Sequence, residues 1–300
     1  MTGFLNILKV PGTSSHQVIA GLRRTLKEKR IGHAGTLDPA AAGVLPVAVG
    51  KATRVLEFID SDKAYRAEVC LGISTNTEDS CGEITSAAEV NIEEDQIRNV
   101  FYSLVGTLEQ VPPMFSAIKL GGKRLYQFAR QGETVHREPR KVSIHEITPV
   151  RFYLNSDRPM VTFDVRCSKG TYVRTLCVEI GKRLGVPAHM SFLIRLEHGS
   201  FKLKDAFAIE EICDYSRTEV VSQVMIPVDY PLKHLPKVKL SDADAWKVRN
   251  GQTVEINRVE TAPQSEPLIS RVYDSKGFFA VAKVNVNPWR LKPLKVIVDS

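Results

Sequence analysis

The sequence predicts a mixed α and β protein built in two parts. Apolar residues alternate over 63–72 and 161–167, which predicts half-buried strands, and apolar residues at helical spacing predict amphipathic helices around them. After about residue 236 the helical signal gives way to several short strands, which predicts a small β-rich unit. We therefore expect a larger unit followed by a smaller one that begins after about residue 236.

The N-terminal region is predicted to begin with a short strand followed by a helix. The strand is an apolar run over 4–8, and Pro11–Gly12 forms the turn after it. Ser14 or Ser15 then caps a helix over 16–26. Basic residues at the end of this helix suit its dipole, and the same residues could meet phosphate groups.

Two elements of opposite type follow. Residues 63–72 place Tyr65 on the apolar face of a strand, and residues 93–104 carry apolar side chains in helical register. Between 115 and 136, basic and aromatic residues are interleaved. This suits RNA, because bases stack on aromatic rings while phosphates pair with cations. A solvated amphipathic helix would give the same pattern.

A strand over 161–167 and a helix over 173–184 are predicted next, joined by a turn at Lys169–Gly170. Thr171 is expected to cap this helix. Arg174 falls in the first helical turn, where a cation opposes the helix dipole, so we expect it to have an anionic partner elsewhere. That partner is either a surface carboxylate or a buried one.

The C-terminal part is predicted to begin with a linker. Residues 214–236 contain three prolines and separate the helical region from four short strands. Asp274–Gly277 is expected to form the hairpin turn between two of these strands. The four strands are 253–256, 268–273, 278–284 and 294–298.

Composition and charge narrow the class of protein. With 43% hydrophobic and 25% charged residues, the 300-residue chain can bury an ordinary core. No apolar run reaches the roughly 20 residues needed to span a bilayer. The first residues lack a signal-peptide pattern, so we expect a cytoplasmic protein with no membrane partner. A net charge of +7 favours a polyanionic partner such as nucleic acid, although any basic soluble protein would carry it.

Neither a metal nor a cofactor is expected. The five cysteines and seven histidines show no metal-binding or disulfide spacing. The chain also lacks a P-loop, a dinucleotide-binding glycine motif and a zinc-protease motif. Cys167 and Cys177 are therefore expected to be small core residues.

A single carboxylate, Asp38, stands in the loop-like segment 32–50, which is otherwise small and apolar. Glycines in such a segment let a ligand approach the main chain closely. Asp38 could therefore serve as a nucleophile or a base. The pair Asp38–Pro39, taken alone, favours a helix start with Asp38 as the cap and Pro39 as the first residue, so this interpretation stands beside the first.

Four segments resemble, in order, the motifs of the bacterial TruB-type pseudouridine synthases. They are GHAGTLDP with its continuation (32–53), DKAYR (62–66), VPPMFSAIK (111–119) and CSKGTYVRTL (167–176). Together they make the resemblance far more specific than any one motif would, and it covers nearly the whole chain.

The resemblance implies an isomerase that converts uridine 55 in the TΨC loop of tRNA to pseudouridine. Such an enzyme breaks the N-glycosidic bond, turns the uracil and rejoins it through C5. The resemblance further implies an α+β catalytic domain over 1–232 with a mixed, largely antiparallel sheet flanked by helices. An RNA-gripping insertion is implied at about 112–141, and a PUA-like RNA-binding β-barrel over 233–300. The T stem-loop of tRNA is the expected partner, bound by a monomer.

Site residues also follow from the resemblance. Asp38 would be the nucleophile, Tyr65 would pack against the target uracil, and Arg174 would pair with Asp38 as the third catalytic residue. Such a guanidinium would favour a charged carboxylate, whereas burial opposes it. Taken alone, several of these residues would be ordinary core or structural residues. The remaining substrate-binding residues implied are His33, Tyr172 and Leu193.

The chain departs from the family at its first motif. The family usually has Asp-Lys-Pro before a Gly and Ser pair, whereas this chain has Lys9-Val10-Pro11 and is one residue shorter after the proline. This motif supports the catalytic loop from behind, so the change bears on the contacts there.

Two other functions fit part of the pattern. A non-catalytic RNA-binding or tRNA-folding protein would use the basic surface, with Asp38 as a helix cap. A uracil-releasing glycosylase would need a water activated by a base, and the Asp38 loop offers no second carboxylate for this.

Overall fold

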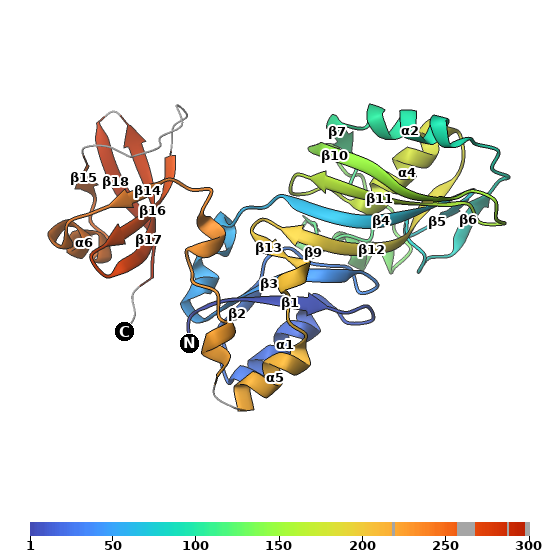
Figure 1. Ribbon diagram of the computed structural model, residues 1–300. Coiled ribbons are helices and arrows are strands. Elements are labelled where there is room, and N and C mark those ends of the chain that lie inside the picture. Colours follow the sequence, from blue (N-terminus) through green and yellow to red (C-terminus); the bar gives the residue numbers. More distant parts are fainter. Residues whose placement is uncertain (218–219, 257–267, 287, 298–300) are drawn as a thin grey trace.

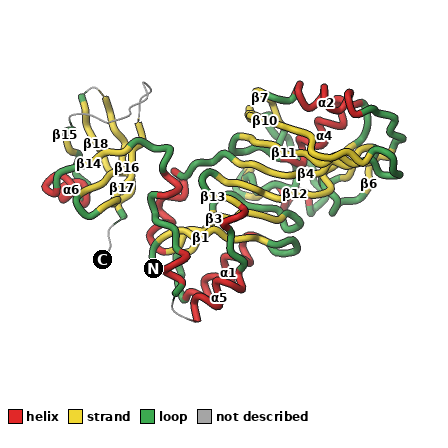
Figure 2. The backbone as a smooth tube through the Cα atoms, viewed as in Figure 1, coloured by secondary structure: helices red, strands yellow, loops and turns green. Residues whose placement is uncertain are grey.

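The computed structural model describes residues 1–217, 220–256, 268–286 and 288–297. Two sheets dominate it, a nine-stranded sheet from the first two thirds of the chain and a five-stranded sheet from the C-terminal part. Figure 1 shows the small sheet set apart from the large one, and the segment coloured orange runs between them. Figure 2 shows the same arrangement by type of secondary structure.

The large sheet is mixed but largely antiparallel, as predicted. Neighbouring strands are antiparallel except β12 and β3, which run parallel. β2 (Ile31–His33) adds to β3, and β13 (Phe201–Lys202) adds to β12. The main path of the sheet, in spatial order, is β1 (Gly3–Lys9), β3 (Ala42–Val49), β12 (Ala188–His198), β4 (Lys63–Leu71), β11 (Met160–Cys167), β10 (Arg140–Tyr153) and β7 (Gly106–Gln110).

β12 joins the two antiparallel halves of this sheet. It pairs with β4 along nearly its whole length, but with β3 only through Ile194 and Arg195. The pairing with β4 shifts register on either side of residues 192–195. These four residues therefore form a regular stretch between two irregularities.

Helices cover the sheet in two groups (Figure 1). α2 (Glu94–Ser103) and α4 (Val173–Leu184) share one buried cluster with β4 and β11. α1 (Ser15–Leu26) and α5 (Ile209–Arg217) share another with β1 and β3. Both clusters form because apolar residues at helical spacing face the apolar side of a strand pair.

Capping residues were predicted for two helices, one of them wrongly. Ser14 caps α1, since its side chain accepts a hydrogen bond from the Gln17 backbone N–H. The prediction that Thr171 caps α4 is wrong. Tyr172 occupies the cap position, and the Thr171 hydroxyl donates to the Ser168 carbonyl at 2.9 Å instead.

Two excursions leave the large sheet. Between β7 and β10 the chain forms β8 (Lys119–Leu120), β9 (Lys123–Arg124) and α3 (Leu125–Ala129). After β4 it forms a hairpin of β5 (Ile73–Thr75) and β6 (Ile84–Ala87). The first excursion contains the interleaved basic and aromatic residues.

Residues 214–236 do not form the predicted linker; residues 218–219 lie outside the described part. After η2 (Leu203–Asp205) and α5, the chain makes the short helices η3 (Val221–Val224) and η4 (Tyr230–Leu232). Phe4 and Ile226 exchange two backbone hydrogen bonds of 2.8 Å, which ties this segment to β1. The prolines of this region therefore lie in a packed segment with short helices.

The small sheet confirms the prediction that the C-terminal part consists mainly of short strands. Its pairs are antiparallel except β14 with β16, and Asp274–Gly277 forms the predicted hairpin turn. The last strand begins before residue 294, and Val298 of the predicted strand lies outside the described residues. The elements are β14 (Lys237–Lys239), β16 (Leu268–Asp274), β17 (Gly277–Val286), β18 (Trp289–Val296) and β15 (Val254–Glu255), with helix α6 (Asp242–Arg249).

The small sheet packs against η1 (Gly50–Phe58), the short helix after β3. Val55 of this helix shares a buried cluster with Val281 of β17. Arg54 donates to the Val296 carbonyl at 2.7 Å. The two sheets are thus connected through the segment that directly follows the Asp38 loop and β3.

Candidate active site

Asp38 lies in the loop between β2 and β3 and does not begin a helix. The Ala41 N–H donates to the Asp38 carbonyl at 3.0 Å, which closes a turn, and β3 starts at Ala42. The helix-cap interpretation is therefore wrong. Leu37 anchors the loop, because it is buried and its N–H donates to the Ser15 hydroxyl at 3.0 Å.

Lys9 holds the loop from behind. Its side chain is completely buried, and Nζ donates to the carbonyls of Pro39 at 3.1 Å and Ala41 at 2.6 Å. The Gly12 N–H donates to the Pro39 carbonyl at 2.9 Å. The shortened first motif thus still contacts the Asp38 loop. Burial lowers the pKa of Lys9 to about 8, and Asp38 opposes this shift.

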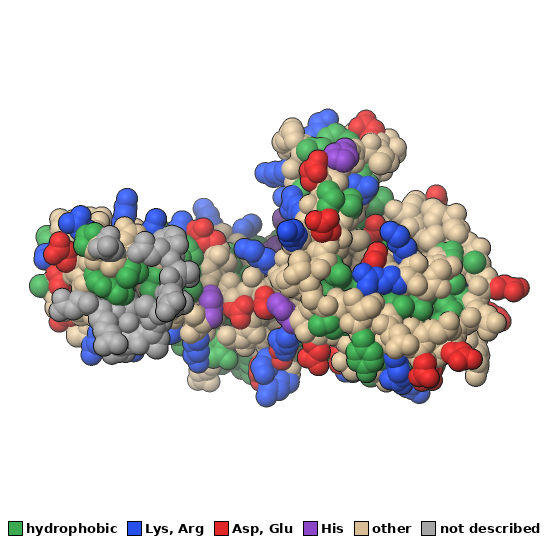
Figure 3. All heavy atoms as spheres, turned by 90° about the horizontal axis from the view of Figure 1, so that it is seen from above, with side chains coloured by type: hydrophobic (Ala, Val, Ile, Leu, Met, Phe, Trp, Pro, Cys, Tyr) green, Lys and Arg blue, Asp and Glu red, His purple; other side chains and the backbone are tan. Residues whose placement is uncertain are grey.

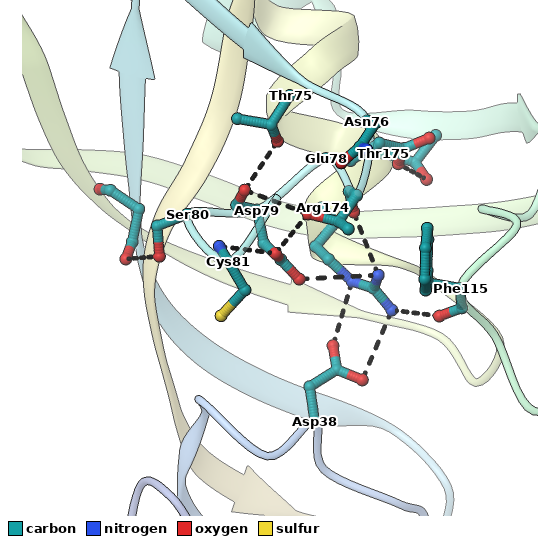
Figure 4. A network of polar contacts seen from close by, with 12 residues as sticks. Asp38, Thr75, Asn76, Glu78, Asp79, Ser80, Cys81, Phe115, Arg174 and Thr175 are labelled. Atoms are coloured by element: carbon teal, nitrogen blue, oxygen red, sulfur yellow. Dashed lines mark hydrogen bonds and ion pairs between the residues drawn. The ribbon is translucent and has the colours of Figure 1, made fainter. Parts of the chain in front are cut away.

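Arg174 and Asp38 form an ion pair in which the arginine is buried. Arg174 Nε lies 3.0 Å from Asp38 Oδ2, and the arginine side chain is only 5% exposed (Figure 4). The same guanidinium donates to the Phe115 carbonyl at 2.8 Å and the Thr77 carbonyl at 3.2 Å. The anionic partner expected for Arg174 is therefore a carboxylate of the distant loop, and the excursion after β7 reaches the same cation.

Asp79 is a second carboxylate at this cation, and we did not predict it. Its Oδ2 lies 3.7 Å from Arg174 Nη1. Its Oδ1 accepts from the Thr77 hydroxyl at 2.6 Å and the Cys81 N–H at 3.0 Å (Figure 4). The sequence signal was weak, because residues 75–82 look like a polar turn. The only indication in the sequence was that Arg174, in the first turn of a helix, was expected to have an anionic partner.

Glu78, next to Asp79, holds the same turn against α4. It has a positive φ of 63° and accepts a 2.8 Å hydrogen bond from the Thr175 hydroxyl. Left-handed backbone is uncommon for a residue other than glycine. The turn is therefore fixed by its side chains to the helix that carries Arg174.

A cavity of about 100 Å³ opens beside the ion pair. Five of the six predicted site residues line it, and only His33 does not. The lining is Thr36, Leu37, Asp38, Tyr65, Thr171, Tyr172, Val173, Arg174 and Leu193.

Tyr65, Tyr172 and Leu193 give this cavity its apolar walls, and the rest of the lining includes polar side chains. Tyr65 is 7% exposed, and burial raises its pKa to about 12, although Arg195 opposes this shift. Burial also raises the pKa of Tyr172. Gln110 fixes Tyr172 by accepting from its N–H at 3.0 Å and donating to its carbonyl at 3.3 Å. Both phenols therefore stay neutral near neutral pH.

His33 ends β2 and packs edge-on against His16, with ring centroids 5.8 Å apart. Burial lowers its pKa to about 4, and His16 adds to the shift. Its Nδ1 has no hydrogen-bond partner among the described residues. His33 is thus a neutral residue next to the Asp38 loop.

The charge of Asp38 is set by opposing effects. Burial raises its pKa above the ordinary value, Arg174 lowers it, and Asp79 raises it further. The net direction is upward, so the guanidinium offsets the burial without cancelling it. An anion held in this way, beside a small cavity that is partly apolar, can act as a nucleophile.

Within the described ranges, no group of three or more His, Cys, Asp or Glu residues could hold a metal ion. The described helices include none that is long and apolar enough to cross a membrane.

Comparison with protein families gives two adjoining matches. Residues 23–173 match the N-terminal domain of the TruB family pseudouridylate synthases, and residues 174–233 match the C-terminal domain of tRNA pseudouridylate synthase B. The chain belongs to the TruB family. The two matched domains meet at the start of α4, so Asp38 and Arg174 come from different matched parts.

Curated TruB family proteins match over most of their length. The tRNA pseudouridine synthase B of Alkaliphilus oremlandii is 46% identical over 258 residues, which are 86% of this chain and 84% of that protein. The protein of the same name from Bacillus cytotoxicus is 43% identical and covers 100% of this chain and 98% of its own length.

Solved structures with the same fold cover both sheets. An H/ACA RNP bound to a substrate RNA containing 2′-deoxyuridine matches 99% of this chain and 85% of its own, with a TM-score of 0.76 at 25% identity. A Cbf5-Nop10-Gar1 complex matches 99% of this chain and 84% of its own, with a TM-score of 0.75 at 27% identity. The fold shared with these structures therefore extends through the C-terminal sheet.

Proposed function

We propose that this protein isomerises uridine 55 in the TΨC loop of tRNA to pseudouridine, with Asp38 as the nucleophile. The observation that carries the proposal is the Asp38–Arg174 ion pair at a small cavity lined by Tyr65 and Leu193. Membership of the TruB family supports the reaction, and the relatives named tRNA pseudouridine synthase B support tRNA as the substrate.

The cavity suits a base taken out of its stack. An enzyme that acts on the ring of a nucleobase must extrude the nucleotide into a pocket. Tyr65 would pack against the uracil, while Tyr172 and Leu193 would form the other walls. The uracil must stay close to the ribose after the glycosidic bond breaks, and a pocket of this small size would hold it there. His33, just outside the cavity, would occupy the space that the base leaves in the RNA.

Asp38 and Arg174 would carry the chemistry. Attack on C1′, addition to uracil C6 and formation of a glycal all use the same carboxylate. In each case Arg174 would keep Asp38 anionic and aimed at the cavity, through contacts at 3.0 and 3.4 Å. Proton loss from C5 and proton uptake at N1 then complete the isomerisation, so the product has the same composition as uridine.

RNA binding would involve surfaces outside the cavity. Lys and Arg side chains recur across the face drawn in Figure 3, from the small sheet at the left to the part that projects at the top of the view. We propose that the catalytic domain spans 1–232 and its insertion at about 112–141 grips the T stem-loop. The sheet after residue 233 would be a PUA-like RNA-binding domain. The enzyme would act as a monomer on tRNA in the cytoplasm.

A uracil-releasing glycosylase is the alternative function. It needs a base that activates water, and the second carboxylate near Asp38, Asp79, could be that base. Asp79 lies near Asp38, but it does not line the cavity and faces Arg174 instead. It is therefore not placed to activate a water within the cavity, and isomerisation fits the geometry better.

Unmodified tRNA labelled with tritium at uridine C5 provides the test. We expect tritium release without loss of uracil, and Asp38→Asn should abolish the release while tRNA binding persists. Free uracil would establish the glycosylase. A protein that binds tRNA but gives neither signal would be a non-catalytic RNA-binding protein.

A further inference from the structure

A second arginine, Arg195, is buried in the middle of the large sheet and takes no part in the Asp38–Arg174 ion pair. It lies on β12, directly opposite Tyr65 of β4 and opposite Gly43 of β3. Its exposed fraction is 0%. A guanidinium cannot lose its charge in a protein, and burying a charge is costly unless it is well bound.

Backbone carbonyls bind this guanidinium. Nε donates to the Val44 carbonyl at 2.7 Å, and Nη2 donates to the Gly35 carbonyl at 2.9 Å. No Asp or Glu of the described chain stabilises the Arg195 cation, whereas the Tyr65 phenol does. Arg195 therefore contacts the Asp38 loop on one side and the aromatic wall of the cavity on the other.

Gly35 and Val44 stand at the two ends of the segment that carries Asp38. We propose that Arg195 is a positioning residue that clamps both ends of residues 35–44 and fixes Asp38 relative to Tyr65. The planar guanidinium suits this role, because it presents several N–H donors in one rigid fork. The inference rests on the proposed function, in which Asp38 must meet a base held by Tyr65.

Close packing shows how tightly the clamp is built. Gly43 has a φ of 112°, and a Cβ added there would lie 2.2 Å from the Arg195 carbonyl oxygen. Gly35 has a φ of 65°, and its added Cβ would lie 3.0 Å from His198 and 3.4 Å from Arg195 Nη1, the second of which is an ordinary contact. Gly43 thus lets the loop backbone come directly against the backbone of Arg195. A displacement of about 1 Å in such a loop can lower the rate about 100-fold.

Arg195→Lys and Arg195→Met test the clamp, with Arg166→Met as the matched control. Lysine keeps the charge but lacks the fork, so it cannot bind both carbonyls in the same way. Methionine fills much of the space and leaves both carbonyls unpaired. Arg166 lies on β11, and its side chain is 45% exposed and pairs with Glu197 of the same strand as Arg195. We would measure single-turnover tritium release, tRNA affinity, and amide hydrogen exchange in the peptide 34–45.

For Arg195→Lys we expect the rate to fall at least about tenfold. The affinity for tRNA should stay within a factor of two, and exchange in 34–45 should accelerate selectively. Arg195→Met should show a larger loss, and Arg166→Met should behave as wild type. If Arg195→Met does not fold, the result for Arg195→Lys alone tests whether Arg195 clamps the loop.

Two outcomes would overturn the clamp. One is a folded Arg195→Lys protein with normal turnover and normal exchange in 34–45. The other is a loss of activity that accompanies faster exchange throughout the protein, which would show a general structural role. If wild-type protein releases no tritium, the proposed function fails instead, and the exchange measurement still reports whether Arg195 holds the loop.

Discussion

Asp79 and Asp38 approach the same Arg174 guanidinium, at 3.7 Å and 3.0 Å respectively. One buried cation therefore serves two carboxylates. Asp79 is anchored through Oδ1 by Thr77 and Cys81, so its Oδ2 is left to face the arginine. This arrangement limits how far Arg174 can move toward or away from Asp38.

Asp79→Asn should lower the rate of the chemical step without weakening tRNA binding. Asparagine keeps an oxygen for the Thr77 and Cys81 contacts but removes the negative charge that faces Arg174. Because Arg174 is then held less firmly, we expect single-turnover rates to fall about tenfold or more. Asp164→Asn is the control, since Asp164 pairs with Arg66 on the surface at 2.7 Å. Equal effects of the two substitutions would rule out a specific role for Asp79.

The single-turnover rate should fall on the acid side of neutrality. Burial raises the pKa of Asp38, so the anion is lost at a higher pH than for an ordinary carboxylate. Below that pKa the rate should drop about tenfold for each pH unit. Arg174 lowers the pKa of Asp38, so Arg174→Gln should move the acid limb to higher pH as well as slowing the reaction.

Rates measured from pH 4 to pH 8 with excess enzyme would show this shift. Arg183→Gln, on the same helix but 31% exposed and paired with Glu179, should leave the midpoint unchanged. An acid limb at the same pH in wild type and Arg174→Gln would contradict the role given to Arg174.

His198 should make the protein less stable at acid pH. It is 2% exposed, and burial lowers its pKa to about 2, with Arg195 and Lys63 adding to the shift. An unfolded histidine has a pKa of about 6.5, so the unfolded chain takes up a proton below that pH and the folded chain does not. Stability is therefore unaffected above about pH 7 and falls as the pH drops below 6.5.

Urea unfolding of wild type and His198→Gln measures this contribution. The difference in unfolding free energy should be constant above pH 7 and should change by about 1.4 kcal/mol per pH unit between pH 6 and 4.5. His136→Gln is the control, because that side chain is 82% exposed. A difference that does not vary with pH would show that His198 is not a buried neutral residue.

Gly43→Ala should be among the most destabilising single substitutions in the chain. Its φ of 112° is unfavourable for alanine, and the new Cβ would lie 2.2 Å from a backbone oxygen that cannot move aside. We expect a loss of about 3–5 kcal/mol of stability. Gly185→Ala has a similar positive φ of 75° but nothing within 4 Å, so it should cost only about 1–2 kcal/mol. Similar melting temperatures for the two variants would refute the steric argument.

The sequence predicted elements well where burial followed a regular pattern. β4 and α2 were predicted almost to their ends, because one face of each is apolar throughout. β12 was not predicted, since Arg195 and His198 are buried among its apolar residues and obscure the alternation. The linker over 214–236 was predicted wrongly because prolines also occur in packed segments.

The candidate site could be predicted only in part for a similar reason. Asp38 and Arg174 stand out as charges in unusual local settings, and each lacks a partner nearby in the sequence. Asp79 and Arg195 do not stand out, because charged residues in a turn or a strand are ordinary until the fold brings them to a cavity. Long-range contacts decide their importance, and no local pattern records those contacts.

The regular stretch 192–195 of β12 has a consequence for how this protein can vary in length. Neighbouring residues of a strand point to opposite faces, so losing or gaining one residue inside this stretch would turn either Leu193 away from the cavity or Arg195 away from the loop. The irregularities that flank it already accommodate such offsets. We therefore expect natural insertions and deletions in this strand to fall at those two places and to spare the four residues between them.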